Sequence, residues 1–371
     1  MARLADSPLQ PRFLAGPTLM RILFLSTATG YLRHKLNPSR DPSYVYRIHN
    51  TALAIRRLGG AADMLHLSDM RIPGRAKGWD VVVIHRPAMS ASFAAAMETF
   101  RRHKTLVFGD FDDLIFSPAQ VADRPSVRTG EKSPHVASAR AQQHLEAIRE
   151  LDGVIASTPV LIDAFAGLAN PPARRVLLPN SWHLAWEPLR HAAPARPAAL
   201  PGGETVTYFS GTRTHDADLA MIAAPLRATL AEFPDFRVSL VGKVGRDGVP
   251  FECSLTPKVP FATYGQRVAA SSVNLAPLED TRFNRAKSAL KIIEAGFFGI
   301  KTVCSPIPDY VDAPASARLL ASSPTQWREA LRAAFQDVVN GCPERDRVRQ
   351  EIQERYCPLT TARRLLSDLG G

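Results

Sequence analysis

Short apolar runs alternate with amphipathic segments along most of the chain. Runs such as RILFLST (21–27) and DVVVIHRP (80–87) are continuously apolar at their centres, which is typical of strands buried on both faces of a sheet. The segment 44–60, which follows the first run, has helical periodicity and ends at two glycines. This order of strands and helices predicts parallel sheets covered by helices on both faces.

The alternation occurs twice, with an interruption at AAPARPAALPGGE (192–204), whose Pro, Ala and Gly content is typical of a linker. We expect strands in the first half at 21–27, 61–67, 80–87, 104–114, 152–158 and 174–180, and in the second half at 205–211, 236–242, 272–278, 301–305 and 317–322. Between and after them we expect helices near 90–102, 136–150, 216–232, 283–300, 325–339 and 361–369. The pattern predicts an α/β protein of two Rossmann-like domains that face each other across a cleft.

The domain limits follow from this pattern. Residues 1–19 contain three prolines and no clear periodicity, so we treat them as a loose leader, and Met20 is a plausible start. We expect a first domain at 20–190, a linker at 191–204 and a second domain at 205–345. The helices at 346–371 would complete the chain and can pack back on the first domain.

Composition narrows the class of protein and its partners. The chain has 371 residues, of which 45% are hydrophobic and 22% charged, as in globular proteins. Lys and Arg outnumber Asp and Glu by 46 to 35, so some surface should attract nucleotides, acidic lipids or nucleic acid, unless the surface is simply rich in arginine. The four cysteines form no CxxC pair, which favours neither disulfides nor zinc and suits a reducing cytoplasm. Without an apolar run of about 18–20 residues, membrane contact would be peripheral.

The segment FNRAKSALKIIEAGFFGIKTVCS (283–305) is predicted to form a helix that runs into a strand. On this helix Lys287, Lys291 and Glu294 would share one narrow arc, with Asn284 as the N-cap. Two lysines four positions apart repel each other by about 0.2–0.5 kcal/mol, and a bound anion would relieve that repulsion. The alternative is an ordinary solvated face of a helix.

The order of several segments resembles the two-Rossmann-domain (GT-B) glycosyltransferases, particularly the retaining family 4 or group 1 enzymes. The resemblance is carried by YRIHNTALAIRRLGG, IASTPVLIDAF, LLPNSW, YFSGTRTHDADLAMI and NLAPLEDTRFNRAKSALKIIEAGFFGIKTVCS, and covers residues 20–340. It implies a nucleotide-sugar donor, UDP- or GDP-linked, and no required cofactor or metal.

The resemblance also implies roles for residues of the second domain. Glu294 matches the second of the family's two glutamates, which contacts the nucleotide ribose, whereas the first would fall at Ala286. Asn284, Lys287 and Lys291 would then hold the sugar half of the donor.

The loop after the first strand of the second domain is the other donor-binding candidate. Gly211 would let the backbone approach the diphosphate, and Arg213 would neutralise the leaving group together with Lys287 and Lys291. The lysine that usually accompanies this arginine in the family is missing. Lys243 is a weaker phosphate candidate or an ordinary loop charge.

Acidic residues end a strand of the first domain, in GDFDDLIF. Asp110, Asp112 and Asp113 could orient an acceptor hydroxyl, hold a divalent cation or satisfy amides of a turn. Arg47, and His85 with Arg86, should point into the same cleft, because ligands of open α/β sheets bind beyond the carboxyl ends of the strands; the alternative for each is a structural role. We assign the three aspartates, Arg47 and His85 to the acceptor side, and Asp112 also to catalysis.

These observations predict a glycosyltransferase that moves a sugar from a nucleotide-diphosphate sugar to a glycan or lipid-linked acceptor, and the resemblance implies that the anomeric configuration is retained. By family habit it would act in surface polysaccharide or glycoconjugate assembly, in the cytoplasm and in peripheral contact with an anionic membrane. The alternatives are a nucleotide-sugar epimerase of the same architecture and a non-catalytic binder of nucleic acid or anionic membrane. The chain lacks a GxxxxGK[ST] loop, HExxH, GxSxG and GxGxxG, and no motif that reads nucleic acid stands out, so we expect no nucleic-acid partner.

Overall fold

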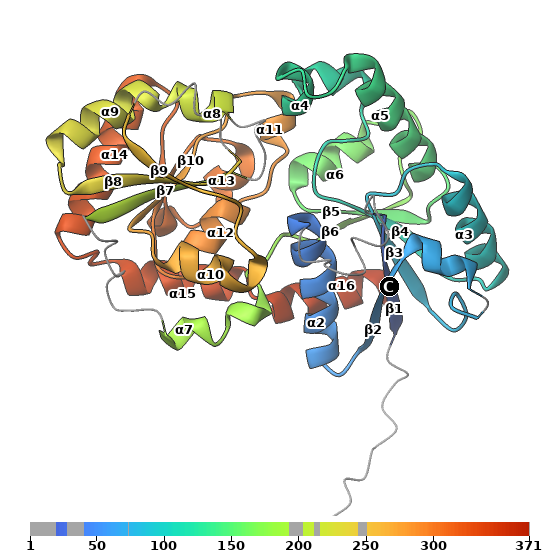
Figure 1. Ribbon diagram of the computed structural model, residues 1–371. Helices are drawn as coiled ribbons and strands as arrows, with labels where there is room; N and C mark the ends of the chain where they lie inside the picture. Colours follow the sequence, from blue (N-terminus) through green and yellow to red (C-terminus); the bar gives the residue numbers. More distant parts are fainter. Residues whose placement is uncertain are drawn as a thin grey trace, which may run out of the picture.

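The computed structural model describes residues 20–27, 41–72, 74–192, 203–210, 216–243 and 251–370, with backbone only at 191 and 192. The expected leader and most of the expected linker lie outside the described residues. Two lobes stand side by side, each built on one sheet (Figure 1). We call the lobe of the first sheet the N lobe and that of the second sheet the C lobe.

The N-lobe sheet is parallel and has the strand order β2-β1-β3-β4-β5-β6. Its strands are β1 Arg21–Ser26, β2 Ala61–His66, β3 Val81–His85, β4 Leu106–Phe111, β5 Gly153–Ala156 and β6 Arg174–Leu177. All five residues of β3 are buried, because helices cover both faces of the sheet. Every strand that the apolar runs predict in this half is confirmed.

Three of the N-lobe helices begin at short polar side chains that cap them. The hydroxyls of Ser90, Ser133 and Thr158 each accept a hydrogen bond from the backbone N–H three residues on. The N-lobe helical elements are η2 Tyr44–His49, α2 Asn50–Arg57, η3 Leu67–Arg71, α3 Ala91–Arg102, η4 Pro118–Asp123, α4 Pro125–Arg128, α5 Pro134–Ile148 and α6 Pro159–Ala166, and the segment after β6 adds η5 Leu184–Trp186 and α7 Leu189–Ala192, with α7 on the C-lobe side (Figure 1). Of these, η2 is a π-helix, a wide turn that is frequent at functional sites.

The C-lobe sheet is also parallel and has the order β12-β11-β10-β7-β8-β9. Its strands are β7 Glu204–Ser210, β8 Phe236–Gly242, β9 Cys253–Thr256, β10 Val273–Ala276, β11 Thr302–Cys304 and β12 Arg318–Leu320. The apolar pattern predicts all of them except β9. This strand lies at the sheet edge, and its sequence CSLT is half-buried or exposed, so it lacks the apolar signal of the central strands.

Helices cover both faces of the C-lobe sheet as well. They are α8 Asp216–Met221, α9 Ala223–Glu232, α10 Phe261–Ala269, α11 Arg282–Arg285, α12 Leu290–Gly296, α13 Pro308–Asp312, η8 Ala315–Ala317, α14 Pro324–Val339 and α15 Arg345–Arg355. At the end of β8, Gly242 has φ +114°, and a Cβ there would lie 1.8 Å from the carbonyl oxygen of Ser210. Only glycine therefore allows β7 and β8 to end this close together.

The last helix, α16 Pro358–Gly370, lies against the N lobe beside α2 (Figure 1). Leu365 and Leu369 are buried in one apolar cluster with Ile48 and Ile55 of the N lobe. Arg174 at the start of β6 also donates through Nη2 to the carbonyl oxygen of Asp368, at 2.7 Å. The chain thus returns from the C lobe and covers an N-lobe face.

Aromatic residues of the segment after β6 join the two lobes on one side of their junction. Trp182 packs on Phe297 with ring centroids 5.2 Å apart, and Trp186 packs on Phe298 at 5.5 Å. Both tryptophans are buried, and their cluster includes apolar residues of both sheets. This aromatic packing holds the N lobe and the C lobe against each other and so determines which of their surfaces face each other.

Candidate functional site

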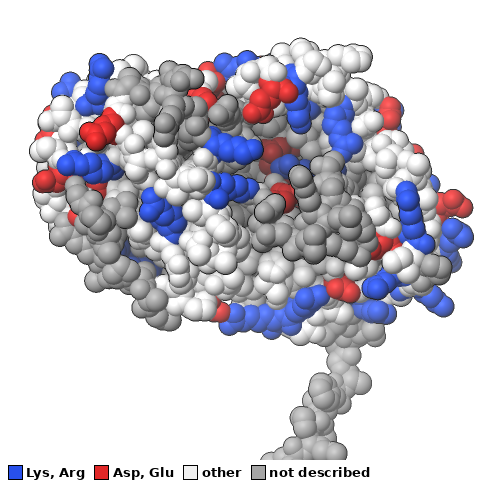
Figure 2. All heavy atoms as spheres, in the orientation of Figure 1, with Lys and Arg blue, Asp and Glu red and all other residues white. Residues whose placement is uncertain are grey.

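A cavity of about 260 Å³ lies between the lobes. The side chains and backbone that line it come from both lobes: Pro42, Tyr46, Asp112, Asp113 and Asn180 on the N-lobe side, and Phe209, Ser210, Val241, Gly242, Lys258, Val259, Phe261, Tyr264, Leu278, Lys287, Ser288, Leu290, Lys291, Glu294 and Tyr310 on the C-lobe side. Figure 2 shows basic side chains on the C lobe beside the junction of the lobes, with acidic side chains in the recess between them. The expected cleft is present.

The segment expected to be one helix from 283 to 300 is broken in the structure. It forms α11 and α12 with a non-helical stretch at 286–289 between them, so Lys287 lies in a loop and only Lys291 lies on a helix. The expectation of two lysines stacked on one helical face is therefore wrong. Even so, both lysines line the cavity.

Contacts from distant parts of the chain explain the break. Thr158 donates to the carbonyl oxygen of Ala286 at 3.1 Å, and Asn180 donates to the hydroxyl of Ser288 at 2.7 Å. Asp309 accepts from the backbone N–H of Ala289 at 2.5 Å. Thr158 and Asp309 satisfy backbone atoms that a continuous helix would otherwise pair internally, and Asn180 holds the side chain of Ser288, so the tertiary contacts override local helical propensity.

Asn284 does not have the predicted capping role. The N-cap of α11 is Thr281, whose hydroxyl accepts from the backbone N–H of Asn284 at 3.1 Å. The amide nitrogen of Asn284 donates to the carbonyl oxygen of Glu279 at 3.0 Å, and its oxygen is buried without a hydrogen-bond partner among the described residues. Since Asn284 is not among the described residues that line the cavity, the structure gives no support for a donor contact.

Lys291 lies on α12, and its ammonium group reaches the end of β7. Its Nζ donates to the carbonyl oxygen of Phe209 and lies 6.0 Å from the ring centroid of Tyr208. The pKa of Lys291 is below its ordinary value because burial disfavours the charged form, an effect that Glu294 opposes and Lys287 increases. An anion in the cavity would restore the lost stabilisation of the charge.

Lys287 links the two walls of the cavity. Its Nζ lies 3.6 Å from Oδ1 of Asp113 and 5.1 Å from the ring centroid of Phe283. Both partners of this ion pair remain partly exposed, so the pair is weak and can exchange for another anion.

Glu294 is only 6% exposed, and each of its carboxylate oxygens accepts a phenol hydroxyl. Tyr46 of the N lobe donates to Oε1 at 2.6 Å, and Tyr264 of α10 donates to Oε2 at 2.9 Å. Burial raises the pKa of Glu294, while Lys291 and the two phenols act to lower it. A carboxylate that accepts two hydroxyls can equally accept the hydroxyls of a sugar.

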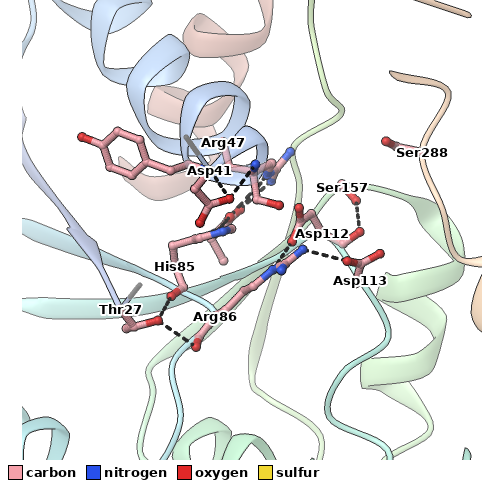
Figure 3. Close-up of polar contacts among 12 residues, drawn as sticks. Thr27, Asp41, Arg47, His85, Arg86, Asp112, Asp113, Ser157 and Ser288 are labelled. Carbon is pink, nitrogen blue, oxygen red and sulfur yellow. Dashed lines mark hydrogen bonds and ion pairs between the residues drawn. The ribbon is translucent and has the colours of Figure 1, made fainter. Parts of the chain in front are cut away.

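On the N-lobe side, Arg47, His85 and Asp110 form a buried network rather than a lining of the cavity (Figure 3). Asp110 accepts from Arg47 Nε at 3.1 Å and Nη2 at 2.5 Å, and His85 Nδ1 lies 2.8 Å from its other oxygen. Burial would raise the pKa of Asp110, but Arg47 and His85 bring it below its ordinary value. The three side chains are 2%, 4% and 1% exposed, so the expectation that Arg47 and His85 point into the cleft is wrong.

Asp112 and Asp113 do line the cavity and share one cation (Figure 3). Arg86 donates through Nε to Asp112 at 2.6 Å and through Nη2 to Asp113 at 2.7 Å. Burial would raise the pKa of Asp112, but Arg86 holds it well below its ordinary value, so this carboxylate stays charged. Arg86 itself has φ +48°, and Thr27 donates to its carbonyl oxygen at 3.3 Å. The backbone is therefore held in an unusual conformation that aims Arg86 at the two acids.

The other candidates divide between the cavity rim and the part of the chain that is not described. Lys243 is exposed at the end of β8, next to the lining residue Gly242. Gly211 and Arg213 lie outside the described residues, so their expected roles stay predictions. Within the described chain, no group of three or more His, Cys, Asp or Glu residues is placed to hold a metal ion.

Several lining residues were not predicted from the sequence. Lys258 lies two residues after β9 and lines the cavity. The sequence did not predict β9, so it did not indicate that Lys258 lies at the end of a strand. Phe261 and Tyr264 of α10 place aromatic rings at the cavity, with Tyr264 5.4 Å from the ring of Phe209. The contact of Tyr46 with Glu294 could not be predicted from the sequence, because the two residues are 248 positions apart.

Two parallel six-stranded sheets that face each other across one cavity invite comparison with solved structures. Neither a protein-family model nor a curated protein sequence matches the chain. Solved structures do match, over nearly the whole chain. A glycosyltransferase from Rickettsia africae has a TM-score of 0.60 and 9% identity, and the match covers 94% of this chain and 98% of that one.

HepE from Anabaena, solved in complex with UDP-glucose, has a TM-score of 0.58 and 13% identity, with coverage of 95% and 99%. The chain has the GT-B fold. TarM is also similar, with a TM-score of 0.53 and 12% identity, but this chain spans only 55% of its length. In the part of this chain that the structure describes, no helix is both long and apolar enough to cross a membrane.

Proposed function

We propose that this protein is a glycosyltransferase that moves a sugar from a UDP- or GDP-linked donor to a glycan or lipid-linked acceptor. The observation that carries the proposal is the set of Lys287, Lys291 and Glu294 along one wall of the cavity between the lobes. HepE, which has the same fold, is solved with UDP-glucose bound, and this supports a nucleotide sugar as the donor. No metal or other cofactor is required by this proposal.

Lys287 and Lys291 form what we call the cationic wall of the cavity, and this wall would stabilise the negative charge that develops during sugar transfer. Positive charge grows on the sugar in an oxocarbenium-like transition state, while negative charge grows on the departing diphosphate. Lys287 and Lys291 would stabilise the diphosphate more in the transition state than in the ground state, which is the requirement for catalysis. We assign Arg213 and Gly211 to the same diphosphate and Lys258 to its outer edge.

The N-lobe wall would receive the acceptor. Asp112 stays ionised beside Arg86 and lines the cavity, so it can accept a hydrogen bond from an acceptor hydroxyl. We propose retention of the anomeric configuration, with the leaving phosphate taking the acceptor's proton. Packing of the lobes around the cavity would exclude water and limit hydrolysis of the donor.

The pathway and location are part of the proposal. We place the enzyme in surface polysaccharide or glycoconjugate assembly, in the cytoplasm at the inner face of the membrane. The excess of Lys and Arg over Asp and Glu, 46 to 35, supports peripheral contact with anionic lipid headgroups.

The test is release of nucleoside diphosphate from a panel of UDP- and GDP-sugars, with and without membrane extract as the source of acceptor. Lys291→Ala should lower turnover by about 100-fold or more, since one lost charge-stabilising donor costs about that much. Glu294→Ala should also lower turnover. Lys132→Ala is the matched control, because Lys132 is exposed on the N lobe and is not among the described residues that line the cavity.

Acceptor-dependent release by the wild type and loss of that release in Lys291→Ala support the proposal. Conversion of one nucleotide sugar into another without any acceptor would contradict it, and so would equal turnover in the wild type and Lys291→Ala.

A further inference from the structure

Glu294 accepts one of the buried hydrogen bonds that join the two lobes, and Thr158 donates another to the carbonyl oxygen of Ala286. Tyr46 belongs to η2 of the N lobe and donates to Oε1 at 2.6 Å, whereas Tyr264 belongs to the C lobe, as Glu294 does, and donates to Oε2 at 2.9 Å. The two phenol hydroxyls therefore occupy the two oxygens of the carboxylate. Each phenol hydroxyl is the same kind of donor as a ribose hydroxyl, and the one from Tyr46 comes from the opposite lobe.

The ring of Tyr46 cannot swing aside by itself. It makes edge-to-face contacts with Trp186 at 6.4 Å, His183 at 6.0 Å and Phe261 at 5.9 Å, and the residue is 5% exposed. The next residue, Arg47, is bound to Asp110 and to the carbonyl oxygen of Leu178. The hydroxyl of Tyr46 must therefore move together with the helical turn that carries it.

Access to Glu294 is limited while Tyr46 is in place. With 6% of Glu294 exposed and a phenol hydroxyl on each oxygen, the acceptor position that Tyr46 fills is closed to a ribose hydroxyl, whereas the remaining lone pairs can accept a second hydroxyl while the Tyr264 bond stays in place. We propose that Tyr46 occupies the ribose position on Glu294 in the free protein, and that nucleotide binding replaces this inter-lobe hydrogen bond and changes the arrangement of the lobes. This inference rests on the proposed function, because it takes the ligand to be a nucleoside diphosphate.

The replacement gives Tyr46 and Tyr264 different effects on affinity. Nucleotide binding to the wild type must break the bond from Tyr46, whereas Tyr46→Phe has already lost it and keeps the ring contacts. Because hydrogen bonds to charged groups are the stronger class, we expect the Kd for UDP or GDP to fall by about fivefold in Tyr46→Phe. Tyr264→Phe removes the same kind of bond within one lobe, and we expect no tighter binding from it.

The experiment measures UDP and GDP binding by titration calorimetry and lobe arrangement by small-angle X-ray scattering on the full-length wild type, Tyr46→Phe and Tyr264→Phe. The expected result is tighter nucleotide binding in Tyr46→Phe alone. The scattering curve of free Tyr46→Phe should also differ from that of the free wild type in the direction that nucleotide changes the wild type. Thermal denaturation verifies that each variant is folded.

Two outcomes separate this inference from the proposed function. If the wild type binds neither nucleotide, the proposed function fails and the inference fails with it. If the wild type binds a nucleotide but Tyr46→Phe binds it with the same or weaker affinity, or both Phe variants tighten binding equally, only the inference is overturned.

Discussion

The two walls of the cavity are built from the same topological position but behave differently. Each has charged side chains near the carboxyl ends of parallel strands: His85 and Asp110 lie in the last residues of β3 and β4, and Lys291 of α12 reaches the end of β7. On the N-lobe side, Arg47, His85 and Asp110 bind one another, lie beneath the surface and are at most 4% exposed. On the C-lobe side, Lys287, Lys291 and Glu294 line the cavity itself. Position at a strand end therefore does not by itself distinguish a binding group from a structural one.

Charge balance separates the two walls more clearly. The charged residues lining the N-lobe wall are Asp112 and Asp113, whereas the C-lobe wall has Lys258, Lys287 and Lys291 against Glu294. The C-lobe wall therefore has positive charge in excess within a partly buried space, where an anion interacts more strongly than in water. The comparison teaches that an excess of one sign of charge beside the cavity, rather than charge at a strand end, distinguishes the proposed donor side.

The largest expected effect comes from breaking the N-lobe network. Asp110→Asn leaves the buried Arg47 without its counter-charge, and such a loss costs about 3–5 kcal/mol of unfolding free energy. Urea denaturation of the purified variant measures this loss. The matched variant is Asp113→Asn, whose side chain is 25% exposed and which should cost about 1 kcal/mol or less. Equal destabilisation by both variants would contradict the distinction between a buried, structural Asp110 and a partly exposed Asp113.

Lys287→Ala should weaken nucleotide binding while it leaves stability almost unchanged, the opposite of what we expect for Asp110→Asn. It removes a weak ion pair, so the unfolding free energy should change by about 1 kcal/mol or less. The Kd for UDP or GDP should rise by about tenfold, because charge-assisted bonds to phosphate are among the stronger ones. Calorimetry and denaturation on the same preparation give both values, with Lys132→Ala as the control. A variant that loses stability but keeps its affinity would assign Lys287 to the scaffold instead.

The smallest expected effect is a pH dependence of nucleotide affinity. Burial lowers the pKa of Lys291, so this lysine loses its proton at a lower pH than an exposed lysine does. Because the charged form binds phosphate, affinity should weaken as pH rises, by about twofold where half of the lysine is neutral. Lys291→Arg keeps its charge and should show a flatter profile, and comparison with it cancels titration of the nucleotide. Parallel profiles for the two proteins would contradict the assignment.

The fold was largely accessible from the sequence because buried strands of parallel sheets are apolar throughout. The runs that became β3 and β10 are continuously apolar, so their positions were predicted, whereas the helix α10 that precedes β10 was not. The edge strand β9 was missed because CSLT is not buried enough to require apolar residues. Local pattern thus predicts the central strands of a sheet better than its edges.

The site was only partly accessible for a related reason. Lys287, Lys291 and Glu294 could be picked out because they lie close together in the sequence. The break between α11 and α12 could not, since it depends on Thr158 and Asp309, which reach the segment from elsewhere in the fold. Tyr46, likewise, acquires its contact with Glu294 only when the lobes come together.

The central claim is that the cationic wall holds the diphosphate of a nucleotide between the lobes. The most direct test is a crystal structure of the protein soaked with UDP and, separately, GDP. The account predicts one of these nucleotides in the cavity, with its phosphates at the Nζ atoms of Lys287 and Lys291 and its ribose hydroxyls at Glu294. A nucleotide bound on an outer face, or a cavity that stays empty at saturating concentrations of both nucleotides, would contradict it.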